Sequence, residues 1–149
     1  MNFKDTFNQF DIKGHIKIFD PITNEILCNK RNAIHYEHLS IALAESLANA
    51  GNGFIHEMSF GNGGTSIDPT GIITYLTPNV NTLDSGLYNQ TYTKVINSSS
   101  SSNIDPLRNK VEVRHLPGMT YTDIFATCLL DYGEPQDQEA LDSSDSVDG

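Results

Sequence analysis

Apolar and polar residues alternate along several short stretches of this chain of 149 residues. A period of two predicts β-strands, because successive side chains of a strand point to opposite faces of its sheet. Near the start, the stretches 13–20 and 25–29 flank the turn-forming residues 21–25 and predict a β-hairpin. Further strands are expected at 54–60, 71–76, 87–96, 110–116 and 120–132.

A different pattern, at 36–50, predicts one helix. Its apolar residues recur at three- and four-residue spacing, which aligns them in one stripe along a helix. Glu37 lies in the first turn, where the helix dipole favours a negative charge, and Gly51 follows where a left-handed C-terminal cap is expected. The stripe consists of Tyr36, Leu39, Leu43, Leu47 and Ala50.

Together these elements predict a mainly β fold. About seven strands and one helix, joined by long Gly- or Ser-rich connections, indicate an antiparallel β-sandwich with one α-helix (about 36–50) packed over a face or an end, and long loops. We expect a single β-rich domain over 1–132. The acidic, serine-rich residues 133–149 are expected to form a flexible tail, and the serine run 97–103 a mobile hairpin tip or crossover.

The charge of the chain limits the classes of molecule that it can bind. The net charge is −10, and six of the 19 acidic residues lie after Gly133, where there is no Lys or Arg. The chain has no concentrated basic surface for phosphates, so we expect no direct nucleic-acid binding. It also has no secretory signal at 1–10 and no apolar run long enough for a membrane helix, so we expect no membrane partner. Cys28 and Cys128 are expected to be free, buried thiols.

The glycine-rich stretch "FGNGGTSIDPTG" at 60–71 is the first candidate for chemistry. A phosphate-binding P-loop requires a Lys directly after the glycines, and none follows until Lys94. The spacing also differs from that of a dinucleotide-binding loop. We therefore predict a structural turn at Gly61, Gly63, Gly64 and Pro69, in which the glycines supply positive φ angles.

The remaining candidates for chemistry are weak. His35 and His38 lie three residues apart and can share a metal ion, but no third ligand follows at a diagnostic spacing. His35 can equally act as a local hydrogen-bonding residue at the helix start. No serine or cysteine lies in a nucleophile motif, so we expect no catalytic residue, no cofactor and no metal site.

Two segments resemble a loose family of tailed-bacteriophage structural proteins. The first, "NAIHYEHLSIALAESLANAGNGFIHEMSFGNGGTSIDPT", has the family's order of parts: Asn32 at a strand end, a small-residue helix, the strand 54–60 and the loop 61–69. The second, "VEVRHLPGMTYTDIFATCLLDYGEP", resembles the closing strands of virion proteins in large myophages. The resemblance implies a β-rich particle component that is present in many copies.

We therefore expect a non-enzymatic structural component of the virion, in the tail, neck or baseplate, whose partners are other copies of itself and other virion proteins. Alternatives are a head decoration protein, a carbohydrate- or receptor-binding β-sandwich module, and, third, an enzyme. The strand at 120–132 is apolar on both faces, which is typical of a central strand or an interface. Candidate interface residues are Tyr88, Tyr92, Tyr121, Phe125 and Leu129.

Overall fold

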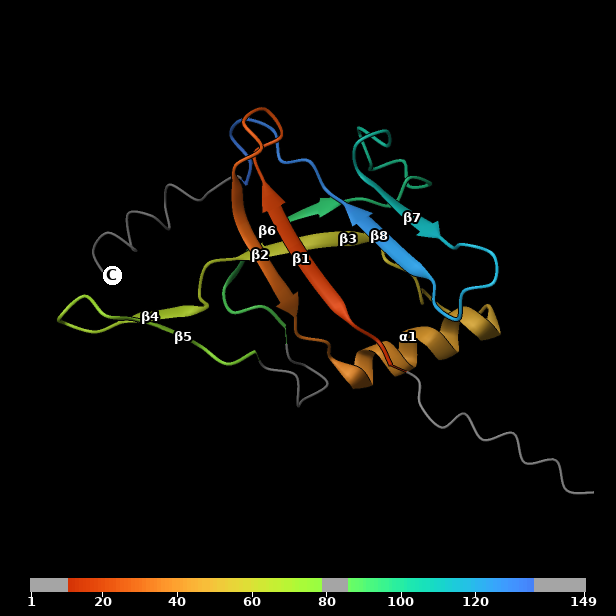
Figure 1. The fold of residues 1–149 in the computed structure, drawn as a ribbon, viewed down its shortest axis with the longest axis horizontal. Helices are drawn as coiled ribbons and strands as arrows, with labels where there is room; N and C mark the ends of the chain where they lie inside the picture. Colours follow the sequence, from red (N-terminus) through yellow and green to blue (C-terminus); the bar gives the residue numbers. More distant parts are fainter. Residues whose placement is uncertain (1–10, 79–85, 136–149) are drawn as a thin grey trace, which may run out of the picture.

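The computed structural model describes residues 11–78 and 86–135, and these residues form short strands and one helix (Figure 1). The mainly β class with one helix is therefore confirmed. In chain order the elements are β1 (Gly14–Phe19), β2 (Ile26–Asn32), α1 (Tyr36–Ala48), β3 (Glu57–Gly61), β4 (Thr65–Ile67), β5 (Ile73–Tyr75), β6 (Gln90–Val95), β7 (Lys110–Arg114) and β8 (Asp123–Thr127).

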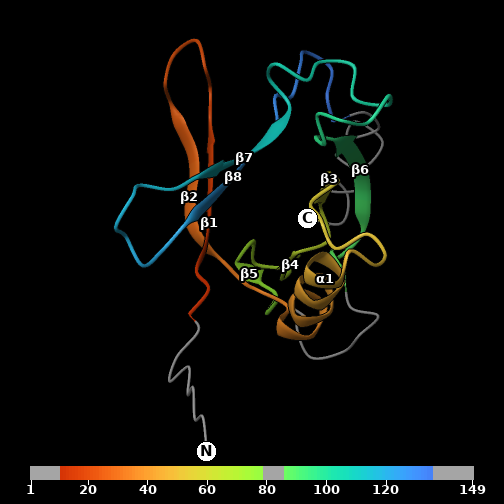
Figure 2. The ribbon, with the colours of Figure 1, turned by 90° about the vertical axis from the view of Figure 1, so that its right-hand side faces the viewer.

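The strands form four separate antiparallel pairs instead of two broad sheets. Three pairs join neighbours in the chain, β1–β2, β4–β5 and β7–β8, and the fourth joins β3 to β6. The backbones of different pairs come close to one another or to α1 at very few positions. In Figure 2 the β1–β2 pair and the β3–β6 pair stand on opposite sides of the molecule. Within the described residues, the strands thus form pairs and no broader sheet.

The first hairpin forms because its turn is specified locally, as the sequence predicts. The carboxylate of Asp20 accepts a hydrogen bond from the backbone N–H of Ile22 at 2.7 Å, and the N–H of Asn24 donates to the carbonyl of Asp20 at 2.8 Å. Asn24 has a left-handed φ of 58°, which asparagine tolerates well. The chain therefore reverses here without a glycine.

The second hairpin, β4–β5, is turned by Asp68 to Gly71. The carboxylate of Asp68 accepts from the N–H of Thr70 at 2.8 Å, and the N–H of Gly71 donates to the carbonyl of Asp68 at 2.9 Å. Pro69 and Gly71 hold the second and fourth turn positions, where these residue types are favoured. Strand β4 lies inside the stretch that the sequence assigns to a loop, because three residues are too few to show a period.

Helix α1 begins where expected and ends two residues early. Asn49, with φ 50°, forms the left-handed cap, and its N–H donates to the carbonyls of Glu45 and Ser46. The prediction that Gly51 provides this cap is wrong, because Asn49 already reverses the chain. The predicted apolar stripe is largely uncovered: Tyr36 is 70% and Leu47 82% exposed.

The described fold has a very small core, and it is mainly polar. Ile96 is the one buried apolar side chain among the described residues. Three polar residues are buried beside it in the chain or nearby: Lys94, Asn103 and Asn109. The serine run 97–103, which the sequence assigns to a mobile hairpin tip or crossover, forms consecutive turns that end at the buried Asn103.

Candidate functional site: a buried lysine cluster and exposed strand faces

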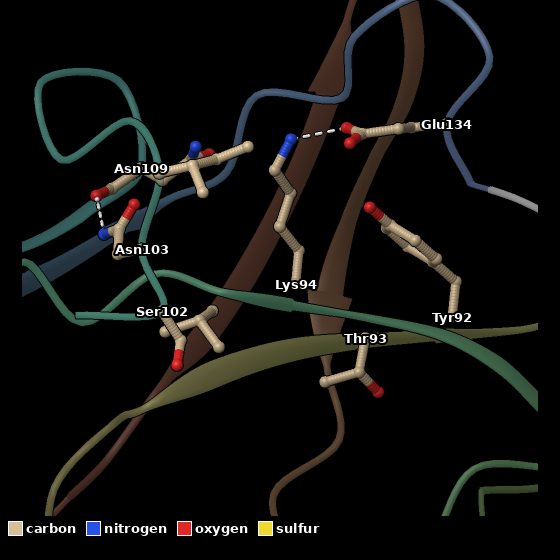
Figure 3. A pocket seen from close by; sticks show the side chains of 9 residues that line it. Tyr92, Thr93, Lys94, Ser102, Asn103, Asn109 and Glu134 are labelled. Atoms are coloured by element: carbon tan, nitrogen blue, oxygen red, sulfur yellow. Dashed lines mark hydrogen bonds and ion pairs between the residues drawn. The ribbon is translucent and has the colours of Figure 1, made fainter. Parts of the chain in front are cut away.

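Strand β6 places Lys94 in the most enclosed position that any charged side chain of the described residues occupies. Only 8% of its side chain is exposed. The Nζ atom donates to the backbone carbonyl of Leu129 at 2.7 Å and forms an ion pair with Glu134, to which Figure 3 shows it pointing. Asp131 Oδ2 lies 3.9 Å away. The ammonium group thus has oxygen partners for its donors, as a buried lysine requires.

Two asparagines continue this cluster. Asn109, 1% exposed, accepts a hydrogen bond at Oδ1 from the N–H of Leu129 at 2.7 Å. The side-chain amide of Asn103 donates to the carbonyls of Asn109 (2.8 Å) and Asn97 (3.1 Å). These bonds hold the turns after β6 and the segment after β8 against each other. The Lys94 cluster therefore joins parts of the chain that no shared sheet connects.

The electrostatics of the cluster follow from the ion pair and from burial. The hydrogen bond from Lys94 lowers the pKa of Glu134 below its usual range. Burial, followed by the hydrogen bond and negative charge of Glu134, raises the pKa of Tyr92. Burial also raises the pKa of the Cys128 thiol, which disfavours the reactive thiolate.

A hollow of about 190 Å³ lies against the cluster, lined in part by Tyr92, Asn103 and Glu134. In Figure 3 the Tyr92 hydroxyl and the Lys94 ammonium both turn toward Glu134. The polar groups thus interact with one another and do not point into the hollow. This arrangement suits a structural clamp that fixes the segment 128–135 on β6.

Lys94 and Glu134 are the residues that sequence reasoning missed. They lie 40 positions apart, so no local pattern links them. The available signal was that Lys94 is the single Lys or Arg between Arg31 and Arg108, inside an otherwise uncharged strand. Glu134 belongs to this cluster although the sequence assigns it to the flexible tail. The tail prediction for residues 136–149 lies outside the described residues.

The glycine turn works by close approach, and the expected positive φ angles are wrong for its three glycines. A Cβ on Gly61 would lie 2.5 Å from the carbonyl oxygen of Tyr88, and one on Gly63 would lie 2.9 Å from Asn89 Cβ. A Cβ on Gly64 would meet nothing within 4 Å. Gly61 and Gly63 therefore make room for the chain before β6, whereas Gly64 has no such role.

The candidate interface residues fall into two environments. Tyr121 is 58%, Phe125 42% and Tyr88 39% exposed. Leu129 and Tyr92 are half-buried beside Lys94 instead. The Phe125 ring on β8 lies under the guanidinium of Arg114, 4.0 Å from its centre. All five remain candidate interface residues, but they do not form a single surface patch.

Larger apolar faces are exposed on other elements. On three of the four strand pairs and on α1, apolar side chains that a packed core would cover stay in contact with solvent. These include Ile16, Ile18 and Phe19 on β1, Leu27 on β2, Ile73 and Tyr75 on β5, Ile124 on β8, and Leu43 and Leu47 on α1. Large exposed apolar patches often mark interaction surfaces, so these side chains are candidates for contacts with a partner.

The histidine pair serves the helix start. His35 Nδ1 accepts from the N–H of His38 at 3.2 Å, and their rings stack with centres 3.8 Å apart. His35 is thus the N-cap of α1, which is the local role that the sequence left open. Across 11–78 and 86–135, no three His, Cys, Asp or Glu side chains gather as metal ligands. Both cysteines are free, and each is half-buried.

No helix in the described part of the chain has the length and apolar character to cross a membrane. No protein-family model, curated protein or solved structure matches this chain.

Proposed function

We propose that the chain is a non-enzymatic structural component of a tailed-bacteriophage particle, in the tail, neck or baseplate, and that it acts by assembling with copies of itself and with other virion proteins. The observation that carries this proposal is the exposure of its apolar strand faces, with Ile96 as the one buried apolar residue of the described part.

The energetics favour a subunit over an independent domain. Ordering the backbone costs roughly 1–2 kcal/mol for each residue. Burial of a large apolar side chain returns about 1.5–3 kcal/mol. With so few side chains buried, the described fold cannot balance that cost alone, and a single strand pair is marginal in water. Contacts with neighbouring subunits are the natural source of the missing burial.

Assembly also accounts for the expected β-sandwich. Three of the four strand pairs expose apolar side chains, and the unpaired edges of each pair can be covered or extended by another sheet. We propose that strand pairs of adjacent subunits stack to complete the two layers. The sandwich then belongs to the assembled particle and is built by more than one copy of the chain.

The assignment to a virion is supported by the resemblance of the segments around 32–69 and 111–135 to phage structural proteins. The rival binding module would gather its exposed aromatic side chains around one loop cluster. Instead, the Tyr88 hydroxyl donates to the carbonyl of Thr77, whereas the carbonyl of Tyr121 contacts His115. The two tyrosines therefore belong to different loops.

Electron microscopy of the purified full-length chain tests this proposal. Rings or tubes of uniform diameter are expected, because a self-complementary subunit closes with symmetry. A field of dispersed, unassembled molecules at every concentration and salt condition would contradict it. The Ile124→Ser variant provides a comparison, since it removes exposed apolar surface from β8 without touching the Lys94 cluster.

A further inference from the structure

The basic residues of the described part differ in whether their side chains have a carboxylate partner. Most of these residues pair with a carboxylate: Lys13, Lys94, Arg108, Lys110 and Arg114. Those that have no carboxylate partner within the described residues, Lys17, Lys30 and Arg31, all lie on the β1–β2 pair. Lys17 and Lys30 lie instead over the aromatic rings of Phe19 and Tyr75. This pair is therefore the positive region of a chain whose net charge is −10.

A hollow of about 360 Å³ lies at the end of this strand pair where β1 begins and β2 ends, next to the start of α1. Lys13 and Arg31 supply positive charge to its lining, while Ile12, Ile34 and Tyr36 supply apolar surface. Tyr36 is 70% exposed, so the hollow has an unshielded aromatic wall. Its chemistry suits a short acidic peptide that carries an aliphatic side chain between its carboxylates.

The chain itself contains such a peptide. Residues 136–149 carry five acidic side chains and no Lys or Arg. Within them, Glu139 and Asp142 flank Ala140 and Leu141. We propose that residues 139–142 of a neighbouring copy bind in this hollow. Leu141 contacts its apolar wall. One carboxylate pairs with Arg31, and the other replaces Asp11 as the partner of Lys13, whose present ion pair with Asp11 is exposed to solvent.

The geometry favours a neighbouring copy over the same chain. In Figures 1 and 2, residues 128–135 run to the end of the molecule opposite α1. The hollow is lined by Ile34 and Tyr36, at the start of α1. A segment that leaves at one end and a binding site at the other produce head-to-tail contacts, which close into rings or extend as filaments. This inference rests on the proposed assembly and names one contact within it.

Cross-linking of the full-length protein tests the contact directly. An equal mixture of ¹⁴N- and ¹⁵N-labelled chains is treated with a carbodiimide, which joins lysine amines to carboxylates in direct contact. We expect links from Lys13 to Glu139 or Asp142, with mixed-isotope pairs as frequent as same-isotope pairs. Links within one isotope only, or links that reach Lys110 equally often, would overturn the inference.

Two variants test the energetics by sedimentation. The Leu141→Ser variant and the double variant Lys13→Gln with Arg31→Gln are each expected to weaken self-association roughly tenfold. The control, Arg108→Gln with Lys110→Gln, removes the same charge from side chains at the start of β7 and is expected to change self-association less than about twofold. Association equal in all variants would refute this contact and leave the proposed function standing. A wild-type chain that never associates would contradict the proposed function itself.

Discussion

Replacing Gly61 with alanine is a sharp test of the described geometry. The new Cβ would lie 2.5 Å from the carbonyl oxygen of Tyr88 and 2.9 Å from that of Asn89. Both atoms belong to the backbone, so no side chain can rotate away. Relief requires a shift of the chain before β6, and that shift weakens the bonds from Asn62 N to Asn89 O (3.2 Å) and from Gly63 N to Tyr88 O (3.3 Å).

The magnitude follows from these two effects. Overpacking costs about 1–3 kcal/mol, and each weakened hydrogen bond adds up to roughly 1 kcal/mol. We expect Gly61→Ala to lose about 2–3 kcal/mol, which lowers Tm by about 4–12 °C in a domain of this size. The measurement is thermal unfolding followed by far-UV circular dichroism, with all samples at one protein concentration because assembly shifts Tm.

Gly64→Ala is the matched control for this experiment. It lies three residues away, has open space around its Cβ and has no left-handed φ. Its effect on stability should stay within about 1 kcal/mol, because alanine only restricts the unfolded chain. Equal unfolding curves for Gly61→Ala and Gly64→Ala would refute the close approach of residues 88–89 to the glycine turn.

Three further outcomes are expected. Lys94→Met should cost about 2 kcal/mol in urea unfolding, because it leaves the 17% exposed Glu134 carboxylate without its cation, and Lys110→Met should cost far less. The pKa of Glu134 in the folded state lies below its ordinary value of 4.5. The ionised Glu134 therefore stabilises the fold above pH 4.5, and this stabilisation is lost as the pH falls through the folded-state pKa. The Glu134→Gln variant should lose less stability than the wild type between about pH 5 and pH 3. The Ile124→Ser variant, on the exposed face of β8, should weaken assembly, which size-exclusion chromatography would show. It should leave the Lys94 cluster intact, so Lys94→Met should cost the same stability in this variant as in the wild type.

Local features of this fold could be predicted from sequence because the residues that specify them are close together. The β1–β2 turn depends on Asp20 and Asn24, and helix α1 depends on its cap at His35 and a spacing visible within two turns. The partner of β3 is different, because β6 begins 29 residues after β3 ends and many residues could fill its place. Strand β4 escaped prediction because it has three residues and follows a glycine run that resembles a loop.

The candidate site also combines features that depend on neighbouring residues with features that depend on residues far apart in the chain. The exclusion of a phosphate loop needed only the residues that follow Gly64. The Lys94 cluster needed the positions of Glu134 and Asn109 in space, which no periodicity supplies. The glycine turn lies between these cases, since the sequence shows that small residues are required there but not that the cause is the carbonyl of Tyr88. A close approach of distant backbone has no signature along the chain.

In the proposed assembly, copies of the chain cover the apolar faces that its own fold leaves exposed. The most direct measurement is the molar mass of the purified full-length protein by light scattering across a range of concentrations. We predict a defined oligomer with a mass that stays constant over the upper part of that range. A stable, folded monomer at all concentrations would contradict the claim, because the exposed faces of β1, β5, β8 and α1 would then have no role in self-assembly.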